Sequence, residues 1–169
     1  MSVLANRKAV YLATIASALA LAAALATERF GGLVPCALCL WERWPYRIAI
    51  AIGLLVIVLP RWHRPLVALL ALALALLAGA GLGLVHVGVE QHWWPSPLPE
   101  CAAPQLGGGT MAERLARMPM FPAKPCDDPT YLIPGLPISM ALMNMLLALA
   151  LALFLAISAV RPPNPARPA

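Results

Sequence analysis

Three long uncharged apolar segments constrain what this chain can fold into more than any other feature of its sequence. Residues 9–26, 66–85 and 138–160 run for 18, 20 and 23 residues without a charged side chain. A helix needs about 17–25 predominantly apolar residues to cross the hydrocarbon core of a bilayer. The chain is 62% hydrophobic and only 11% charged, which is more apolar surface than a soluble core of this length can use. The sequence therefore predicts membrane-spanning helices.

A fourth predicted span is less uniform. Its strictly apolar part, residues 48–59, is too short to cross a bilayer alone. The full span must therefore begin near Cys39 and cover about residues 39–59, with two tryptophans and a Glu–Arg pair in its first turns. Tryptophans at that depth fit an interfacial aromatic belt. The predicted fold is all-α and integral to the membrane, a four-transmembrane-helix bundle in one domain over residues 1–169.

The segments between the predicted spans differ in character. Short connections are predicted at residues 27–38 and 60–65. Residues 86–137 form a long ordered loop rich in Pro and Gly, and the tail at residues 161–169 is expected to be disordered. Inside the long loop, Thr110 and Glu113 form a capping-box pattern, which predicts a short helix. That helix could lie on the membrane surface or in solvent.

The first apolar segment has a second interpretation as a signal peptide, because basic residues precede it and Ala24-Leu25-Ala26 resembles a cleavage site. A spanning helix is favoured because the run exceeds the ~7–15 residues of a signal peptide and three more spans follow. The basic residues of the chain are scattered and form no stripe interleaved with aromatics, so the net charge of +5 does not indicate a nucleic-acid partner.

Orientation depends on the lysines and arginines in short loops. Each face of the predicted bundle has six basic residues, but three on one face lie in the long loop, where the rule is weak, and all seven acids share that face. Both termini are therefore predicted to be cytoplasmic.

The predicted topology places all four cysteines on one side. Cys36 and Cys39 follow the first span, whereas Cys101 and Cys126 follow the third, and odd-numbered spans exit on the same face. In the inner membrane of a bacterium that face is periplasmic, where disulfides persist.

The spacing Cys36-x-x-Cys39 at a predicted helix N-terminus indicates thiol chemistry, because unsatisfied backbone N–H groups there stabilise a thiolate. The alternatives are an inert disulfide or half of a zinc site. Zinc usually takes four ligands, and Cys101 and Cys126 are too far apart to form a second C-x-x-C, so no metal site is predicted.

Arg43 lies one helical turn beyond Cys39 and shares its face. Its guanidinium can stabilise a thiolate and can donate hydrogen bonds to a carbonyl oxygen of a bound ligand. The alternative is an arginine that extends to the lipid headgroups, paired with Glu42 or Glu28.

The loop pair, Cys101 and Cys126, is either a disulfide that staples the loop or a carrier that exchanges with Cys36 and Cys39. Two cysteine pairs can pass electrons but cannot dispose of them. The sequence contains no haem motif or dinucleotide fingerprint, so a lipid-soluble quinone is the acceptor that would complete a relay.

Two stretches carry a resemblance to a known family. Residues 34–43, Val-Pro-Cys-Ala-Leu-Cys-Leu-Trp-Glu-Arg, closely resemble the signature of DsbB, the bacterial disulfide bond formation protein B. Residues 86–91 and 93–97, followed by Cys101, resemble the approach to that family's second cysteine pair. The resemblance covers nearly the whole chain and combines several motifs.

The resemblance implies a protein-disulfide:quinone oxidoreductase. Reduced DsbA, a soluble thioredoxin-like oxidase, would attack the Cys101–Cys126 disulfide at Cys101. Electrons would then pass to Cys36–Cys39 as Cys126 exchanges with Cys36. The Cys39 thiolate would contact a membrane quinone, either ubiquinone or menaquinone.

The resemblance also assigns Arg43 to stabilising the quinone complex and His86 to a position near the quinone, with His92 as the alternative histidine. Glu90 would pair with an arginine or face water. Two other functions are open: a paralogue that oxidises a different thiol partner, and a non-catalytic four-helix membrane protein with structural disulfides.

Overall fold

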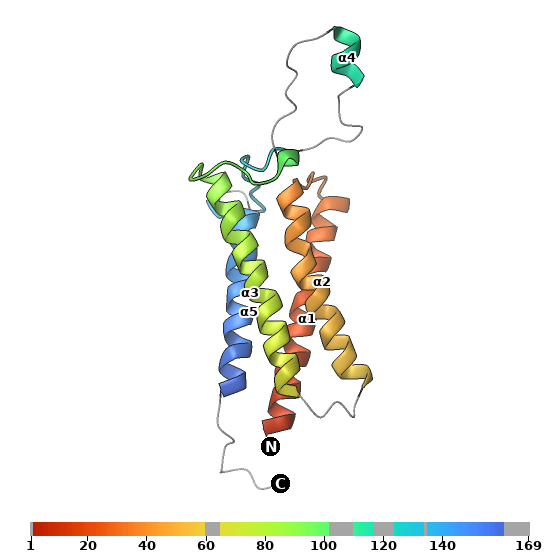
Figure 1. Cartoon of the computed structure of the whole chain (residues 1–169), viewed down its shortest axis with the longest axis vertical. Helices are drawn as coiled ribbons and strands as arrows, with labels where there is room; N and C mark the ends of the chain where they lie inside the picture. Colours follow the sequence, from red (N-terminus) through yellow and green to blue (C-terminus); the bar gives the residue numbers. More distant parts are fainter. Residues whose placement is uncertain (1, 60–64, 102–109, 117–123, 134, 161–169) are drawn as a thin grey trace.

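The computed structural model describes residues 2–59, 65–101, 110–116, 124–133 and 135–160. Within these ranges the regular structure is helical, and one isolated antiparallel bridge joins Tyr131 to Ser139. The described elements are, in order, α1 Ser2–Arg29, α2 Ala37–Val58, α3 Pro65–Glu90, η1 Pro99–Cys101, α4 Met111–Ala116 and α5 Met140–Val160. The long helices α1, α2, α3 and α5 form a bundle, and α1 begins at the end of the bundle where α5 finishes (Figure 1).

Three of the described helices are long and apolar enough to cross a membrane. The candidate spans within them are Asn6–Arg29, Leu66–Glu90 and Met140–Val160. Helix α2 does not meet the same criterion, because every window of 18 residues in it contains Glu42, Arg43 and Arg47. The all-α prediction is thus confirmed, three predicted spans are supported by length and composition, and the fourth stays a prediction.

Helix α3 is central to the bundle. It packs along α5 and α2 and, over a shorter contact, along α1. Because α3 is apolar on every side, polarity does not distinguish its inner face from its outer face. Leu69, Leu72 and Leu76 are fully buried, whereas Leu70 and Leu74 are 54% and 69% exposed. The outward leucines form the kind of surface that a bilayer covers.

Two glycines let α3 approach its neighbours closely. A Cβ added at Gly79 would lie 3.0 Å from Cβ of Pro45 in α2. A Cβ added at Gly83 would lie 2.9 Å from Cβ and 3.0 Å from Cα of Met145 in α5. Since the backbone of Met145 cannot turn aside as a flexible side chain can, Gly83 fixes the spacing between α3 and α5.

Most helix ends lie near the predicted boundaries, with one difference that affects the site. The predicted long loop begins at residue 86, but α3 continues to Glu90. The end of the helix was predicted from the end of the uncharged segment. Residues 86–90 contain no proline, so the helix extends beyond that segment. His86 therefore lies on a helix. Most of the predicted turn at 60–65, and the whole tail at 161–169, lie outside the described residues.

The chain reverses sharply after α3. His92 has a positive φ of 59°, and the indole Nε1 of Trp94 donates a hydrogen bond of 3.1 Å to the carbonyl oxygen of Val85. This reversal brings η1 back onto the bundle, where it contacts α2. The cysteine-bearing part of the long loop therefore lies over the N-terminal end of α2.

The predicted capping box is confirmed. Thr110 N donates to Glu113 Oε2 at 2.9 Å, and Glu113 N donates to Thr110 Oγ1 at 3.4 Å. These bonds begin α4, which stands away from the bundle (Figure 1).

Candidate thiol–disulfide site

Cys36 and Cys39 lie at the start of α2. Cys36 is the N-cap residue, in an extended conformation, and its Sγ accepts a hydrogen bond of 3.2 Å from Cys39 N. The two Sγ atoms are 2.8 Å apart and neither cysteine is in a disulfide. The C-x-x-C spacing thus closes one helical turn, which keeps both sulfurs within reach of disulfide formation.

The helix cap also influences the acidity of Cys36. The hydrogen bond with the Cys39 side chain is the largest influence on the pKa of Cys36 and lowers it, and the backbone N–H of Cys39 acts in the same direction. Burial of the thiol opposes these effects, but the net pKa is below the ordinary value for cysteine. The surroundings of Cys36 therefore favour its thiolate form.

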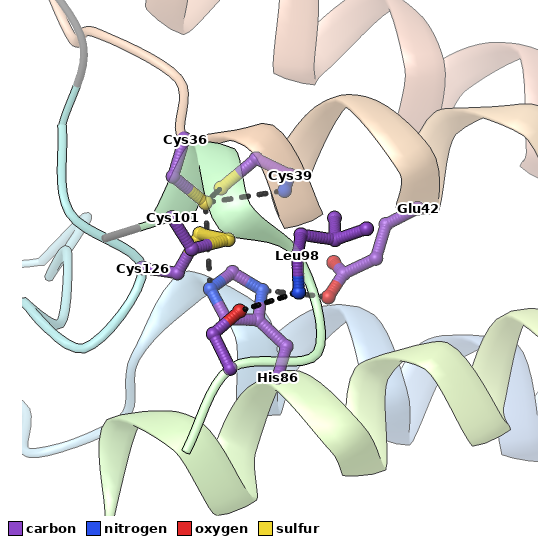
Figure 2. The surroundings of a disulfide bond; sticks show 8 residues. Cys36, Cys39, Glu42, His86, Leu98, Cys101 and Cys126 are labelled. Carbon is purple, nitrogen blue, oxygen red and sulfur yellow. Dashed lines mark hydrogen bonds and ion pairs between the residues drawn. A yellow bond between two sulfur atoms is a disulfide. The ribbon is translucent and has the colours of Figure 1, made fainter.

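His86 connects the cysteine pair to a buried carboxylate (Figure 2). Its Nε2 lies 3.5 Å from Cys36 Sγ, and its Nδ1 lies 2.7 Å from Glu42 Oε1. His86 and Glu42 are 3% and 6% exposed, so their contact is shielded from solvent within the protein. The carboxylate fixes the imidazole with Nε2 directed at the sulfur.

The other oxygen of Glu42 continues the polar network into α5. Asn144 Nδ2 donates to Glu42 Oε2 at 2.7 Å, and Asn144 Oδ1 accepts a hydrogen bond of 2.6 Å from the Tyr46 hydroxyl. Both carboxylate oxygens therefore have partners, as a buried carboxylate requires. The network joins α2, α3 and α5 beneath the cysteines.

A largely apolar pocket opens beside this network. Its volume is about 690 Å³ when the solvent at its open mouth is counted, and it is lined by α1, α2, α5, the segment between α1 and α2, and Thr130. Cys39 and Arg43 both line it. Arg43 Nη1 pairs with Glu28 Oε2 at 2.7 Å, and the Arg43 side chain is only 11% exposed. A guanidinium has five N–H donors, so this ion pair leaves donors for a ligand.

Cys101 and Cys126 form a disulfide, and both are buried. Cys101 ends η1, and Cys126 N donates to the carbonyl oxygen of Cys101 at 3.5 Å. The disulfide belongs to one apolar cluster with Cys36, and Cys39 packs at the edge of that cluster. Figure 2 shows the two cysteine pairs together above His86.

The structure brings most of the predicted site residues together at one end of the bundle. All four cysteines, Arg43 and His86 lie there. His86 contacts Cys36 and is not among the residues that line the pocket, and its position near a quinone stays a prediction. His92 lies apart from the site, with a side chain 75% exposed.

The structure gives partners to Arg43 and Glu90. Arg43 pairs with Glu28, one of the two carboxylates that the sequence offered as its partners. The expectation for Glu90 was wrong: its Oε2 accepts a hydrogen bond of 2.5 Å from Ser139, and the residue is 6% exposed. The fold of the segment before α5 places Ser139 there, and the sequence carried no sign of it.

The site contains three residues that were not predicted from the sequence: Glu42, Tyr46 and Asn144. Asn144 offered a signal, because it interrupts the apolar segment at 138–160 and a polar residue within a span is often functional. Glu42 follows Cys39 at the same three-residue interval that separates the two cysteines, and this places it on the cysteine side of α2.

The family model described as disulfide bond formation protein DsbB matches residues 6–158 of the chain. The chain belongs to the DsbB family. It is therefore a multi-pass membrane protein of disulfide bond formation, with thiol oxidoreductase chemistry in general. Comparisons with curated proteins and with solved structures gave no match.

Proposed function

We propose that the protein reoxidises a periplasmic thioredoxin-like oxidase of the DsbA type and passes the electrons through its two cysteine pairs to a membrane quinone. The observation that carries the proposal is the contact between the two pairs: the Cys101–Cys126 disulfide and Cys36 share one buried cluster. A structural staple in the loop does not need a dithiol beside it. Membership of the DsbB family supports the same reaction.

The proposal requires α2 to be the fourth span, with the cysteines in the periplasm and both termini in the cytoplasm. Three charged residues count against α2 by composition, but Glu42 and Arg43 are buried and paired within the bundle. Only Arg47 is exposed, and it stacks on Trp44 with 5.2 Å between Cζ and the ring centroid. A paired charge inside the protein is far less costly in a bilayer than one facing lipid.

The first exchange takes place at the loop disulfide. A thiolate of the reduced partner attacks Sγ of Cys101, which forms a mixed disulfide and releases Cys126 as a thiolate. The partner's second thiolate then releases Cys101, so the partner leaves oxidised and the loop pair is a dithiol. The buried position of Cys101 in η1 means that the loop must open for this attack.

The second exchange moves the two electrons to the pair at the helix cap. The Cys126 thiolate attacks Sγ of Cys36 in a Cys36–Cys39 disulfide, which forms a Cys36–Cys126 bridge and releases Cys39 as a thiolate. The Cys101 thiolate then attacks Sγ of Cys126 and releases Cys36. The loop disulfide is restored and Cys36 and Cys39 become thiols. The arrangement in the structure, with a loop disulfide and a free pair at the start of α2, corresponds to the state after this step.

The pocket beside Cys39 fits a quinone head group. Its lining is mainly apolar, as a lipid-soluble ring requires, and Arg43 provides hydrogen-bond donors for a carbonyl oxygen. A quinone held there would supply the oxidant, taking up the two electrons and two protons that Cys36 and Cys39 lose on forming their disulfide. His86, held by Glu42, is placed to take the proton of the Cys36 thiol.

The test is quinone-dependent oxidation of a reduced DsbA-type protein by the purified protein in lipid, followed as loss of partner thiols and formation of quinol. We expect turnover with ubiquinone or menaquinone and none in Cys39→Ser. The matched control is His92→Asn, which removes an exposed imidazole and tolerates the positive φ. Turnover that survives Cys39→Ser overturns the proposal. Failure with every DsbA-type partner, together with turnover of another thioredoxin-like protein, favours the paralogue.

A further inference from the structure

Three metal-binding atoms converge where the cysteine pair meets α3. Sγ of Cys36, Sγ of Cys39 and Nε2 of His86 all lie within 4.8 Å of one another. We propose that the reduced protein binds one Zn²⁺ through these three side chains, and that this ion holds the pair in its dithiol state. The spacing of the cysteines argued against a zinc site built from both pairs, but the structure supplies an imidazole from α3 in place of the loop cysteines.

The donor set suits zinc. Thiolate sulfur and imidazole nitrogen are the preferred zinc ligands, at about 2.3 Å and 2.0–2.1 Å. Two thiolates and a neutral imidazole also balance the charge of a divalent ion, which matters because Cys36 and His86 are buried. Three protein ligands leave one position of a tetrahedron open for water. Mg²⁺ and Ca²⁺ prefer oxygen ligands and do not match this set.

The surroundings of His86 resemble those of a metal ligand. Metal-binding histidines usually donate their second ring N–H to a carboxylate, which fixes the tautomer and the ring orientation. Glu42 Oε1 lies 2.7 Å from Nδ1 of His86, so Nε2 is free to face the sulfurs. Asn144 holds the other oxygen of Glu42 at 2.7 Å. Glu42 and Asn144 thus hold the imidazole in the orientation that a metal ligand needs.

Binding depends on the redox state of the pair. A Cys36–Cys39 disulfide has no thiolate to offer, so only the dithiol form supplies all three ligands. By linkage, an ion that binds the dithiol and not the disulfide stabilises the dithiol. The effect on turnover rests on the proposed function: an ion held by both thiolates blocks their oxidation, and the enzyme stays reduced until the ion leaves.

Binding is tested with Co²⁺, a spectroscopic substitute for Zn²⁺, on the Cys101→Ser/Cys126→Ser variant, in which Cys36 and Cys39 are the remaining cysteines. We expect the reduced protein to take up one Co²⁺ with a thiolate-to-cobalt charge-transfer band and tetrahedral visible bands. Zn²⁺ should displace it, and the oxidised protein should give neither band.

Substitutions of His86 and of its carboxylate partner Glu42 test which side chains bind the ion. His86→Ala and His86→Gln should abolish the tetrahedral spectrum, and Glu42→Gln should weaken binding about 10–100-fold, the usual effect of losing a carboxylate partner. His92→Asn should bind like the parent. Helix content measured by circular dichroism separates loss of a ligand from loss of the fold.

Absence of the bands in the reduced parent overturns the inference, as does an unchanged spectrum in folded His86→Gln. Neither result bears on the oxidase, which is measured without added metal. Conversely, if the protein binds Co²⁺ but never oxidises a partner, the metal site stands and the proposed effect of the ion on turnover is overturned.

Discussion

At the scale of single residues, the site works by pairing each reactive group with one fixed neighbour. Cys36 has the backbone and side chain of Cys39, His86 has Glu42, and Arg43 has Glu28. Each pairing orients a group that would otherwise sample several rotamers. The same pairings allow the reactivity of each group to be tested separately.

The low pKa of Cys36 predicts a pH profile for its alkylation. In the variant without loop cysteines, the Cys36 thiolate should persist to lower pH than an ordinary cysteine, so its reaction with iodoacetamide should decline only as pH falls through that lowered pKa. Cys39→Ala removes the side chain with the largest effect and should move the profile to higher pH. Mass spectrometry identifies the alkylated residue, and an unchanged profile would contradict the assignment.

Arg43 should affect quinone affinity. A hydrogen bond to a charged group contributes about 1.5–3 kcal/mol, so Arg43→Ala should raise the KM for quinone roughly 10–100-fold. Arg43→Lys should recover part of that loss, because it keeps the charge but not the planar donors. Steady-state kinetics with a quinone series measure both, and Arg47→Ala is the control since Arg47 stacks on Trp44 outside the pocket. Equal effects of the two alanine variants would exclude a specific role for Arg43.

At the scale of helices, close approach of α3 to its neighbours is what assembles the network. His86 comes from α3, Glu42 from α2 and Asn144 from α5, so the hydrogen bonds form only at the observed helix spacing. Gly79 and Gly83 permit that spacing. Small residues at such positions allow close backbone contact between membrane helices.

Gly83→Ala should therefore destabilise the bundle relative to Gly81→Ala. Overpacking of this kind costs about 1–3 kcal/mol, because α5 must move away from α3. Thermal unfolding in detergent, followed by circular dichroism, should show a lower Tm than in the parent. Gly81→Ala is a matched control on the same helix, since an added Cβ there meets nothing within 4 Å. If the Gly81 and Gly83 variants unfolded alike, Gly83 would not set the spacing between α3 and α5.

The sequence predicted the elements better than the contacts between them. Uncharged runs located the helices, and the capping box at Thr110 located α4, because both signals are local. The pairing of His86 with Glu42 joins residues 44 apart, and that of Asn144 with Glu42 joins residues 102 apart. These contacts depend on how apolar helices rotate against one another, and an all-round apolar surface does not encode that rotation in any simple pattern.

At the scale of the whole molecule, the number of spans decides where the chemistry lies. With four spans both ends of the chain lie on one side of the membrane, and the cysteine end of the bundle faces the other side. With three spans the ends lie on opposite sides. Figure 1 has the start of α1 and the end of α5 at the same end of the bundle, in keeping with four.

Reporter fusions distinguish these two topologies. We expect a fluorescent protein to be fluorescent when fused before α1 or after Val160, and alkaline phosphatase to be inactive at both places, because both sites are predicted to be cytoplasmic. Alkaline phosphatase inserted in the loop between α3 and η1 should be active. The physical reason is that α2 exposes Arg47 but buries Glu42 and Arg43 in paired contacts. Opposite results at the two ends would remove α2 from the membrane, and with it the shared periplasmic location of the two cysteine pairs.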